Sequence, residues 1–169
     1  MNKEDTLTSD TLLDGARMYA AAADAVNNKL PNSFHVLSHL MATSIELALK
    51  AYLRKNGYSE RQLKSLGHNL KVLLDKACTL GFEYTGSRNF VLYVSGYIYK
   101  QRLFVYPENC NLNTILPKRL RQMVDEIIRE VFILLYGEEE YNNSSNKQGL
   151  FIDSSYPDDL DASNWSKTT

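Results

Sequence analysis

The sequence predicts an all-α protein, a bundle of about five helices followed by a disordered acidic tail. Apolar residues recur at spacings of three and four along most of the chain, which is typical of amphipathic helices. Residues that favour helix starts and helix ends stand between these segments. We therefore expect one helical domain over residues 1–137 and a disordered tail over residues 138–169.

Two long helices are expected first. Ser9 or Asp10 is placed to cap a helix with an alanine-rich middle, whose small side chains permit close packing. Ser33 is placed to cap a second helix that runs to about Lys55. Its residues 45–53 are apolar nearly all round, which predicts that this helix is the central element of the bundle.

Shorter helices are expected next. Gly57 is a typical left-handed cap at the end of the second helix, and Ser59 and Gln62 have the spacing of a capping box for about two turns. Gly67 with the following His opens a leucine-rich helix that closes near Gly81.

The last part of the bundle is less regular in composition. Residues 87–106 are rich in β-branched and aromatic residues, but their apolar spacing fits a helix and no partner strand is evident. Pro117 is expected to start the last helix and Gly137 to end it. Few apolar residues follow, so residues after 137 are predicted to be disordered.

Charge and cysteine content bound the class of protein. Residues 138–169 carry a net charge of −5, and residues 1–137 carry +4, which is too small to require a nucleic-acid partner. Cys78 and Cys110 are predicted to be reduced thiols of a cytoplasmic protein. The polar N-terminal residues argue against a secretory signal, and no apolar run is long enough to cross a membrane.

Polar residues follow one face of the predicted second helix. Glu46 and Lys50 form a pair four residues apart in an otherwise apolar run, either as a solvated stripe or as a charge pair at a subunit interface. The stripe could form a phosphate-accepting surface, and its members are His35, His39, Thr43, Glu46, Lys50 and Arg54.

A metal site is a weaker interpretation of that stripe. His35 and His39 have the spacing by which two imidazoles share a metal, with Glu46 as a third ligand. Val36, however, stands where a metalloprotease helix carries its Glu. We predict neither a metal nor a cofactor.

Further candidate residues lie beyond that helix. His68 is either a helix-start residue bonded to nearby backbone or a member of a site with Glu46 or Arg102. Lys100 and Arg102 lie among aromatic residues that include Tyr106, a composition that suits base stacking with phosphate contacts, and equally a core or a dimer interface. The basic start of the last helix, Lys118-Arg119-x-Arg121, could be kept for an anionic partner or could be solvated.

The order of these segments resembles the HEPN superfamily over roughly residues 10–136. The similarity rests on "SIELALKAYLRKNG" with Glu46 and Lys50, on "GHNL" at residues 67–70, and on "YIYKQRLFVYPE" with Arg102 and Tyr106. The resemblance implies a compact bundle that pairs through a two-fold interface, often in prokaryotic defence or toxin–antitoxin systems. In ribonuclease members an Arg and a His four to six residues apart line a cleft between two subunits. There the His transfers a proton and the Arg stabilises phosphate charge.

The chain departs from that ribonuclease pattern. No His follows residue 68, so Arg102 has no His after it, and Arg61-x6-His68 fits the spacing at a different place in the order of helices. The missing His favours a helical module that forms a homodimer and binds a partner, either an antitoxin or other protein, or RNA or a nucleotide. The candidate binding residues are Glu46, Lys50, Arg61, Lys100 and Tyr106. The alternative is a metal-independent endoribonuclease in which Arg102 or Arg61 acts with His68.

Overall fold

The structure, a computed structural model, describes residues 7–30, 33–83 and 117–144. These residues form six helices and no strand, which confirms the all-α class. The helices are α1 (Ser9–Lys29), α2 (Phe34–Lys55), α3 (Glu60–Leu66), α4 (Leu70–Thr79), α6 (Pro117–Tyr136) and α7 (Glu138–Asn143). The helix predicted at residues 87–106 lies outside the described ranges.

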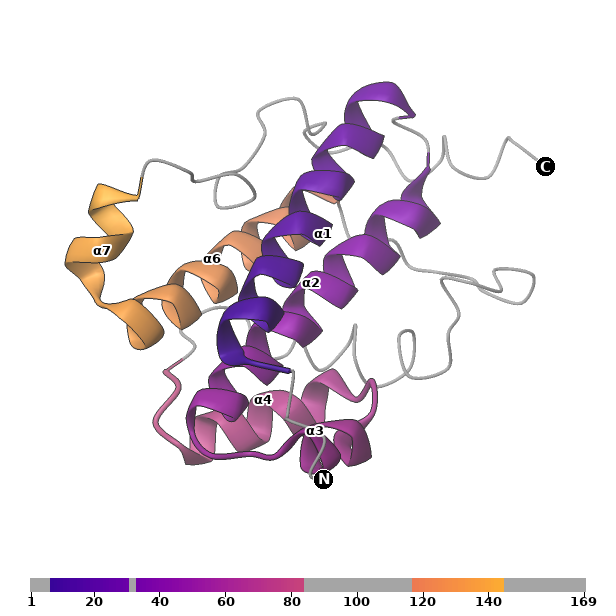
Figure 1. Cartoon of the computed structure of the whole chain (residues 1–169). Coiled ribbons are helices and arrows are strands. Elements are labelled where there is room, and N and C mark those ends of the chain that lie inside the picture. The colour runs from indigo at the N-terminus through magenta and orange to yellow at the C-terminus, as the bar shows by residue number, and fades with distance from the viewer. Residues whose placement is uncertain (1–6, 31–32, 84–116, 145–169) are drawn as a thin grey trace.

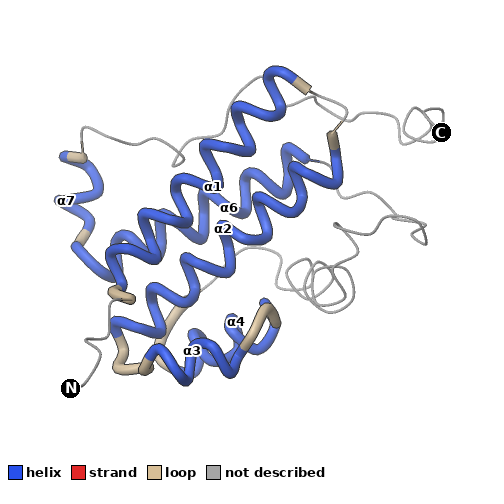
Figure 2. The backbone as a smooth tube through the Cα atoms, turned by 45° about the vertical axis from the view of Figure 1, so that its right-hand side comes forward, coloured by secondary structure: helices blue, strands red, loops and turns tan. Residues whose placement is uncertain are grey.

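The three longest helices lie side by side. Figures 1 and 2 show α1, α2 and α6 together, with α3 and α4 across one end of α2 and α7 beyond the end of α6. The chain reverses between α1 and α2, and α6 also runs antiparallel to α1. Two contacts hold α6 antiparallel to α1. Arg121 near the start of α6 donates to Asp24 near the end of α1, and Tyr136 at the end of α6 donates to Asp10 near the start of α1.

Helix α2 is the centre of the bundle, as its apolar circumference predicted. Its residues 45–53 are buried or nearly so, and Ile45, Leu49 and Leu53 have no exposed surface. Helices α1, α3, α4 and α6 all contact it. A helix that is apolar nearly all round is stable in water when other helices cover every side, and here four of them do.

Helix α1 packs closely against α2. Ala16, Ala20 and Ala23 are fully buried, and the Ser44 hydroxyl of α2 donates a hydrogen bond of 2.7 Å to the Ala16 carbonyl of α1. A Cβ placed at Gly15 would come within 3.2 Å of the Leu47 side chain. The small residues that predicted close packing therefore set the separation of these two helices.

The helix starts differ in part from the prediction. Thr8, and neither Ser9 nor Asp10, caps α1, because its hydroxyl accepts from the Thr11 amide at 3.1 Å while the Thr11 hydroxyl accepts from the Thr8 amide. Ser33 stands at the cap of α2 without a side-chain capping bond. A reciprocal pair of capping bonds satisfies two backbone donors at once, which explains why Thr8 takes the position at α1.

The predicted turn between α2 and α3 is confirmed. Gly57 has a φ of 91°, in the left-handed region that glycine enters without strain. The Ser59 hydroxyl accepts from the Gln62 amide at 3.3 Å, and the Gln62 side chain accepts from the Ser59 amide at 2.8 Å. This is the capping box that the sequence predicted.

The boundary at Gly137 is confirmed, but the disorder predicted directly after it is wrong for six residues. Helix α6 begins at Pro117 and ends at Tyr136, and α7 then covers Glu138–Asn143. The three glutamates in its first turn are stabilising there, because they lie at the positive end of the helix dipole. Tyr141 also packs on α6, with its ring 5.8 Å from that of Phe132 and 5.6 Å from the Arg129 guanidinium. Residues 145–169 of the predicted tail lie outside the described part of the chain.

A buried ion cluster joins α1 to α6. The Arg121 side chain has no exposed surface, and it donates to both carboxylate oxygens of Asp24 at 2.8 and 3.1 Å. It also donates to Asp125, one turn along α6. Burial raises the pKa of the Asp125 carboxyl to about 6, although the adjacent guanidinium acts in the opposite direction. One buried cation therefore serves two acids, and Asp125 is the acid that is harder to ionise.

We predict that Asp125→Asn changes how stability depends on pH. The pKa of Asp125 is raised to about 6 in the folded protein, above the value of about 3.9 in an unfolded chain, so folding strengthens proton binding here. The resulting stability is fully present below about pH 4 and is lost as the pH rises through about 6. Urea denaturation measures the free energy of unfolding of the wild type and of Asp125→Asn. The difference, wild type minus variant, should fall by roughly 1–3 kcal/mol as the pH rises from 4 to 7.

Asp75, whose more exposed carboxylate pairs with Lys71 at 2.8 Å on α4, is given the same Asp→Asn change as the matched control for this series. A difference between wild type and Asp125→Asn that stays constant from pH 4 to pH 7 would contradict the prediction.

Candidate functional site: a buried carboxylate beneath an exposed histidine

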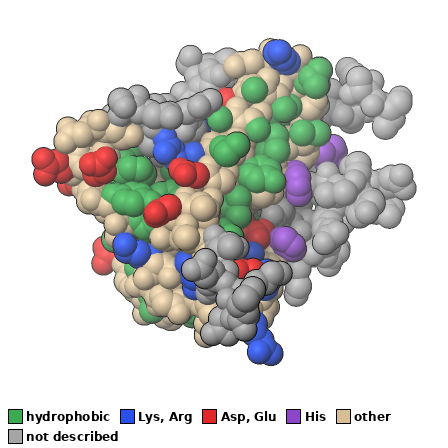
Figure 3. All heavy atoms as spheres, in the orientation of Figure 1, with side chains coloured by type: hydrophobic (Ala, Val, Ile, Leu, Met, Phe, Trp, Pro, Cys, Tyr) green, Lys and Arg blue, Asp and Glu red, His purple; other side chains and the backbone are tan. Residues whose placement is uncertain are grey.

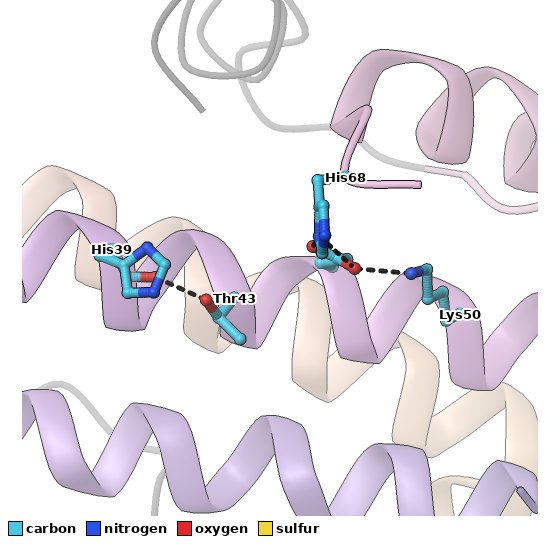
Figure 4. Close-up of polar contacts among 5 residues, drawn as sticks. His39, Thr43, Lys50 and His68 are labelled. Carbon is cyan, nitrogen blue, oxygen red and sulfur yellow. Dashed lines mark hydrogen bonds and ion pairs between the residues drawn. The ribbon is translucent and has the colours of Figure 1, made fainter. Parts of the chain in front are cut away.

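The candidate site joins the middle of α2 to the turn between α3 and α4. Glu46 and Lys50 lie one turn apart on α2, and His68 lies in the turn. Figure 4 shows His68 above α2, with dashed lines from its ring to a carboxylate of α2 and from that carboxylate to Lys50. Two residues that the sequence predicted as binding residues and one predicted as catalytic therefore meet in one cluster.

Glu46 is the buried centre of this cluster. Its residue surface is 3% exposed, and its carboxylate accepts from Lys50 Nζ at 2.6 Å. His68 Nδ1 lies 2.9 Å from Oε2 and 3.2 Å from Oε1 of the same carboxylate. The interpretation of Glu46 and Lys50 as a solvated stripe is therefore wrong, since both side chains are largely withdrawn from water, with 5% and 12% exposed.

Local structure fixes His68 above α2. Gly67 ends α3 with a φ of 60°, and the chain turns there before α4 begins. The Asn69 side chain accepts from the Val72 amide at 3.3 Å and so caps α4. Leu63 before the turn and Leu70 after it are buried in the core. The turn that carries His68 is thus anchored on both sides.

The predicted start of α4 at Gly67 and His68 is displaced by two residues. Helix α4 begins at Leu70, and Asn69 supplies the cap. An Asn side chain is a better acceptor for orphan amides than a His ring, which explains the displacement. His68 is left outside the helix, and its ring reaches a carboxylate 22 positions earlier in the chain.

The cluster combines a hidden carboxylate with an accessible imidazole. The His68 side chain is 59% exposed, whereas the Glu46 side chain that binds it is 5% exposed. A carboxylate on Nδ1 favours the tautomer with the proton on Nδ1. The charges of Glu46 and Lys50 offset each other. This arrangement can bind an anion or transfer a proton through Nε2.

Of the other predicted site residues, the structure describes Arg61, which does not join this cluster. Arg61 is exposed on α3, and within the described ranges no hydrogen bond or ion pair connects it to His68. Lys100, Arg102 and Tyr106 lie outside the described residues.

The rest of the polar stripe on α2 has mixed roles. The Arg54 guanidinium donates to the Leu7 and Tyr58 carbonyls, both at 2.8 Å, and so ties the chain before α1 to the end of α2. The Thr43 hydroxyl donates to the His39 carbonyl at 2.8 Å, within the helix (Figure 4). Burial lowers the pKa of His35. The sequence assigned the side chains of Thr43 and Arg54 to a phosphate-accepting surface. In the structure both side chains donate to backbone carbonyls.

Metal binding finds no further support in the part of the chain that is described. No group of three or more His, Cys, Asp or Glu side chains there could hold a metal ion. The carboxylate of Glu46, expected as a third ligand, is bound to Lys50 and His68. Among the same residues, no helix has the length and apolar character needed to span a bilayer.

The structure also corrects the interpretation of Arg121. The sequence placed it with Lys118 and Arg119 at a basic helix start that could face an anionic partner, but its side chain is fully buried between Asp24 and Asp125. The spacing of four between Arg121 and Asp125 was a visible signal for an ion pair on α6. Asp24 lies 97 positions away, and local spacing carries no signal for it.

We predict that Glu46→Ala lowers the free energy of unfolding by about 3 kcal/mol or more, because it leaves Lys50 largely buried without its counter-charge. Glu60→Ala is a matched control, since Glu60 and Lys64 on α3 have the same spacing and order but more exposed side chains. We expect a loss of about 0.5 kcal/mol there. Chemical denaturation measures both, and equal small losses would show that Glu46 is solvated in solution.

Comparisons with known proteins found no relative of this chain. The chain matches no protein-family model, no curated protein and no solved structure. The function is therefore inferred from the Glu46–Lys50–His68 cluster together with the resemblance in the sequence.

Proposed function

We propose that the chain is a HEPN-like helical module that pairs with a second copy and binds RNA at the surface around His68. The observation that carries the proposal is the exposed imidazole of His68 held by the buried carboxylate of Glu46 at 2.9 Å. The resemblance to the HEPN superfamily supplies the expected context, a prokaryotic defence or toxin–antitoxin system.

The energetics of the cluster support a binding role. A charge withdrawn from water costs free energy, and a buried ion pair adds little stability beyond that of an apolar pair of the same size. Glu46 is nonetheless placed in the most apolar part of α2, where it holds an imidazole at the surface. A restrained, protonatable ring beside Lys50 suits one phosphate group, and the modest charge of the body suits an interaction confined to a small area.

RNA binding would depend on His68 in a way that a titration can measure. His68→Gln keeps an N–H donor for Glu46 but cannot become positively charged. Loss of one charge-assisted contact to phosphate should weaken binding about tenfold or more. It should also make binding less dependent on salt concentration. Fluorescence anisotropy with a labelled single-stranded RNA at several salt concentrations measures both effects.

The control for this titration is Lys76→Gln, which removes an exposed cation at the end of α4. Equal effects of His68→Gln and Lys76→Gln would indicate attraction to the whole surface and would contradict a site at His68. A wild type that binds no RNA at low salt would contradict the RNA-binding proposal.

A metal-independent endoribonuclease is the second candidate, and the same geometry favours it. A carboxylate that holds an imidazole through Nδ1 orients the ring, and Nε2 would be the atom that accepts a proton from a ribose 2′-hydroxyl or protonates a leaving oxygen. Glu46 would stabilise the imidazolium that forms. An Arg is needed to stabilise charge on the phosphate. Arg61 and Arg102 are the candidates from the sequence.

RNA cleavage in the presence of EDTA separates the two candidates. If His68 is the acid–base group, His68→Ala should lower the cleavage rate by about 10²–10⁴-fold. Lys76→Gln should leave the rate unchanged, and Arg102→Ala and Arg61→Ala should identify the Arg. Binding without cleavage in the wild type would support the module, and cleavage that survives His68→Ala would contradict the enzyme proposed here.

A further inference from the structure

Helix α1 carries a continuous stripe of exposed residues along one face. The stripe consists of Thr11, Asp14, Met18, Ala22, Ala25 and Lys29, which follow one another at steps of 3, 4, 4, 3 and 4. Such steps keep successive side chains on one side of a helix. All six residues are exposed, and Met18 reaches 72% although it is a large apolar side chain. We call this set the α1 stripe.

The centre of the α1 stripe is apolar and its two ends carry opposite charges. Met18, Ala22 and Ala25 form the centre, with Asp14 before them and Lys29 after them. Hydrophobic side chains gather over α1 and the neighbouring part of α2 on the face shown in Figure 3. Large apolar side chains on a surface mark contact sites when they form a patch with a polar rim.

We propose that the α1 stripe binds the α1 stripe of a second copy of this chain, with the two helices antiparallel across a two-fold axis near Ala22. In a two-fold interface, each contact occurs twice with the roles of the copies exchanged. Midway between Asp14 and Lys29 the chain is at residues 21 and 22. Reversal about that point places Met18 of one copy opposite Ala25 of the other.

This arrangement is complementary in size and in charge. A long side chain at position 18 meets a small one at position 25, and the small residues at the centre allow the two helices to approach closely. The same reversal places Asp14 of each copy opposite Lys29 of the other. A parallel arrangement would place like charges together, so the charges select the antiparallel one. The self-complementarity of the α1 stripe is the reason to assign it to a second copy and not to a different protein.

The size of the contact sets its strength. A helix of 21 residues is about 31 Å long, so two crossed helices alone form an interface at the small end of the range for stable dimers. Exposed ion pairs contribute little free energy, so the apolar centre supplies most of the affinity and the charges supply the orientation. We therefore expect a dimer that dissociates on dilution. The inference deepens the pairing that belongs to the proposed function, and it rests on that proposal only for its biological meaning.

Sedimentation velocity of the full chain over a range of protein concentrations tests the inference. The wild type should shift from monomer to dimer as concentration rises, and Ala22→Glu should remain monomeric. Ser65→Glu, an exposed position on α3, is the control for an added acid. Asp14→Lys and Lys29→Asp should each weaken the dimer at least tenfold. The double variant Asp14→Lys/Lys29→Asp should restore it, because the charges are exchanged between the two copies. Circular dichroism verifies that every variant is folded.

Three results would overturn the inference. A wild type that stays monomeric at the highest concentration would show that no second copy binds α1. A dimer unaffected by Ala22→Glu would place the interface on another face. A double charge variant as weak as the single variants would exclude the antiparallel arrangement. RNA titration of the same samples reports on His68 separately, so failure of the α1 interface is distinguishable from failure of the RNA site.

Discussion

The apolar circumference of α2 is the constraint on which the bundle depends. Between Ile45 and Leu53 this helix has almost no polar surface to offer to water, so it must be covered on every side. Helices α1, α6, α4 and α3 provide that cover. Burial of α2 also withdraws Glu46 and most of Lys50 from water, and each of these charges then needs a partner inside the protein. The cluster with His68 is a direct consequence of where the backbone places them.

Two buried ion clusters with opposite composition lie in the described part of the chain. At Glu46 one acid serves two bases, and at Arg121 one base serves two acids. The Arg121 cluster joins α1 to α6. Its cation has no exposed surface, so the cluster stabilises the packing of the two helices. The Glu46 cluster opens to solvent through His68, whose side chain is mostly exposed. Access to solvent is the physical difference that makes one cluster a candidate site and the other a link between helices.

The two proposed surfaces belong to different elements and serve different purposes. His68 is placed by α2 and by the turn between α3 and α4, whereas the α1 stripe faces away from the core on a helix whose opposite side packs on α2. A change on one surface can therefore be made without altering the contacts of the other. This separation suits a module that pairs through one face and meets its partner through another.

The sequence by itself determined the helical class and most helix boundaries. The spacing of apolar residues located α2 and its central position, and local signals at Gly57, Ser59 and Pro117 gave turn and helix starts, because these depend on neighbours in the chain. The sequence did not show which of several neighbouring residues caps a helix. Thr8 and Asn69 cap α1 and α4, where other residues were expected. Helix α7 was missed because the contact of Tyr141 with α6 helps to hold it, and the composition of residues 138–143 does not reveal that contact.

The candidate site was decided by the tertiary structure. The sequence identified Glu46, Lys50 and His68 as candidates, but the spacing of four left a solvated pair and an interface pair both open, and no local rule connects His68 to a carboxylate 22 positions earlier. Folding of α3 and α4 against α2 brings them together, and burial of Glu46 changes a weak surface pair into a charge cluster. Asp24 and Arg121 were joined in the same way across 97 positions. Periodicity along the chain reports which face of a helix is apolar, whereas the partner of a buried charge depends on which elements pack together.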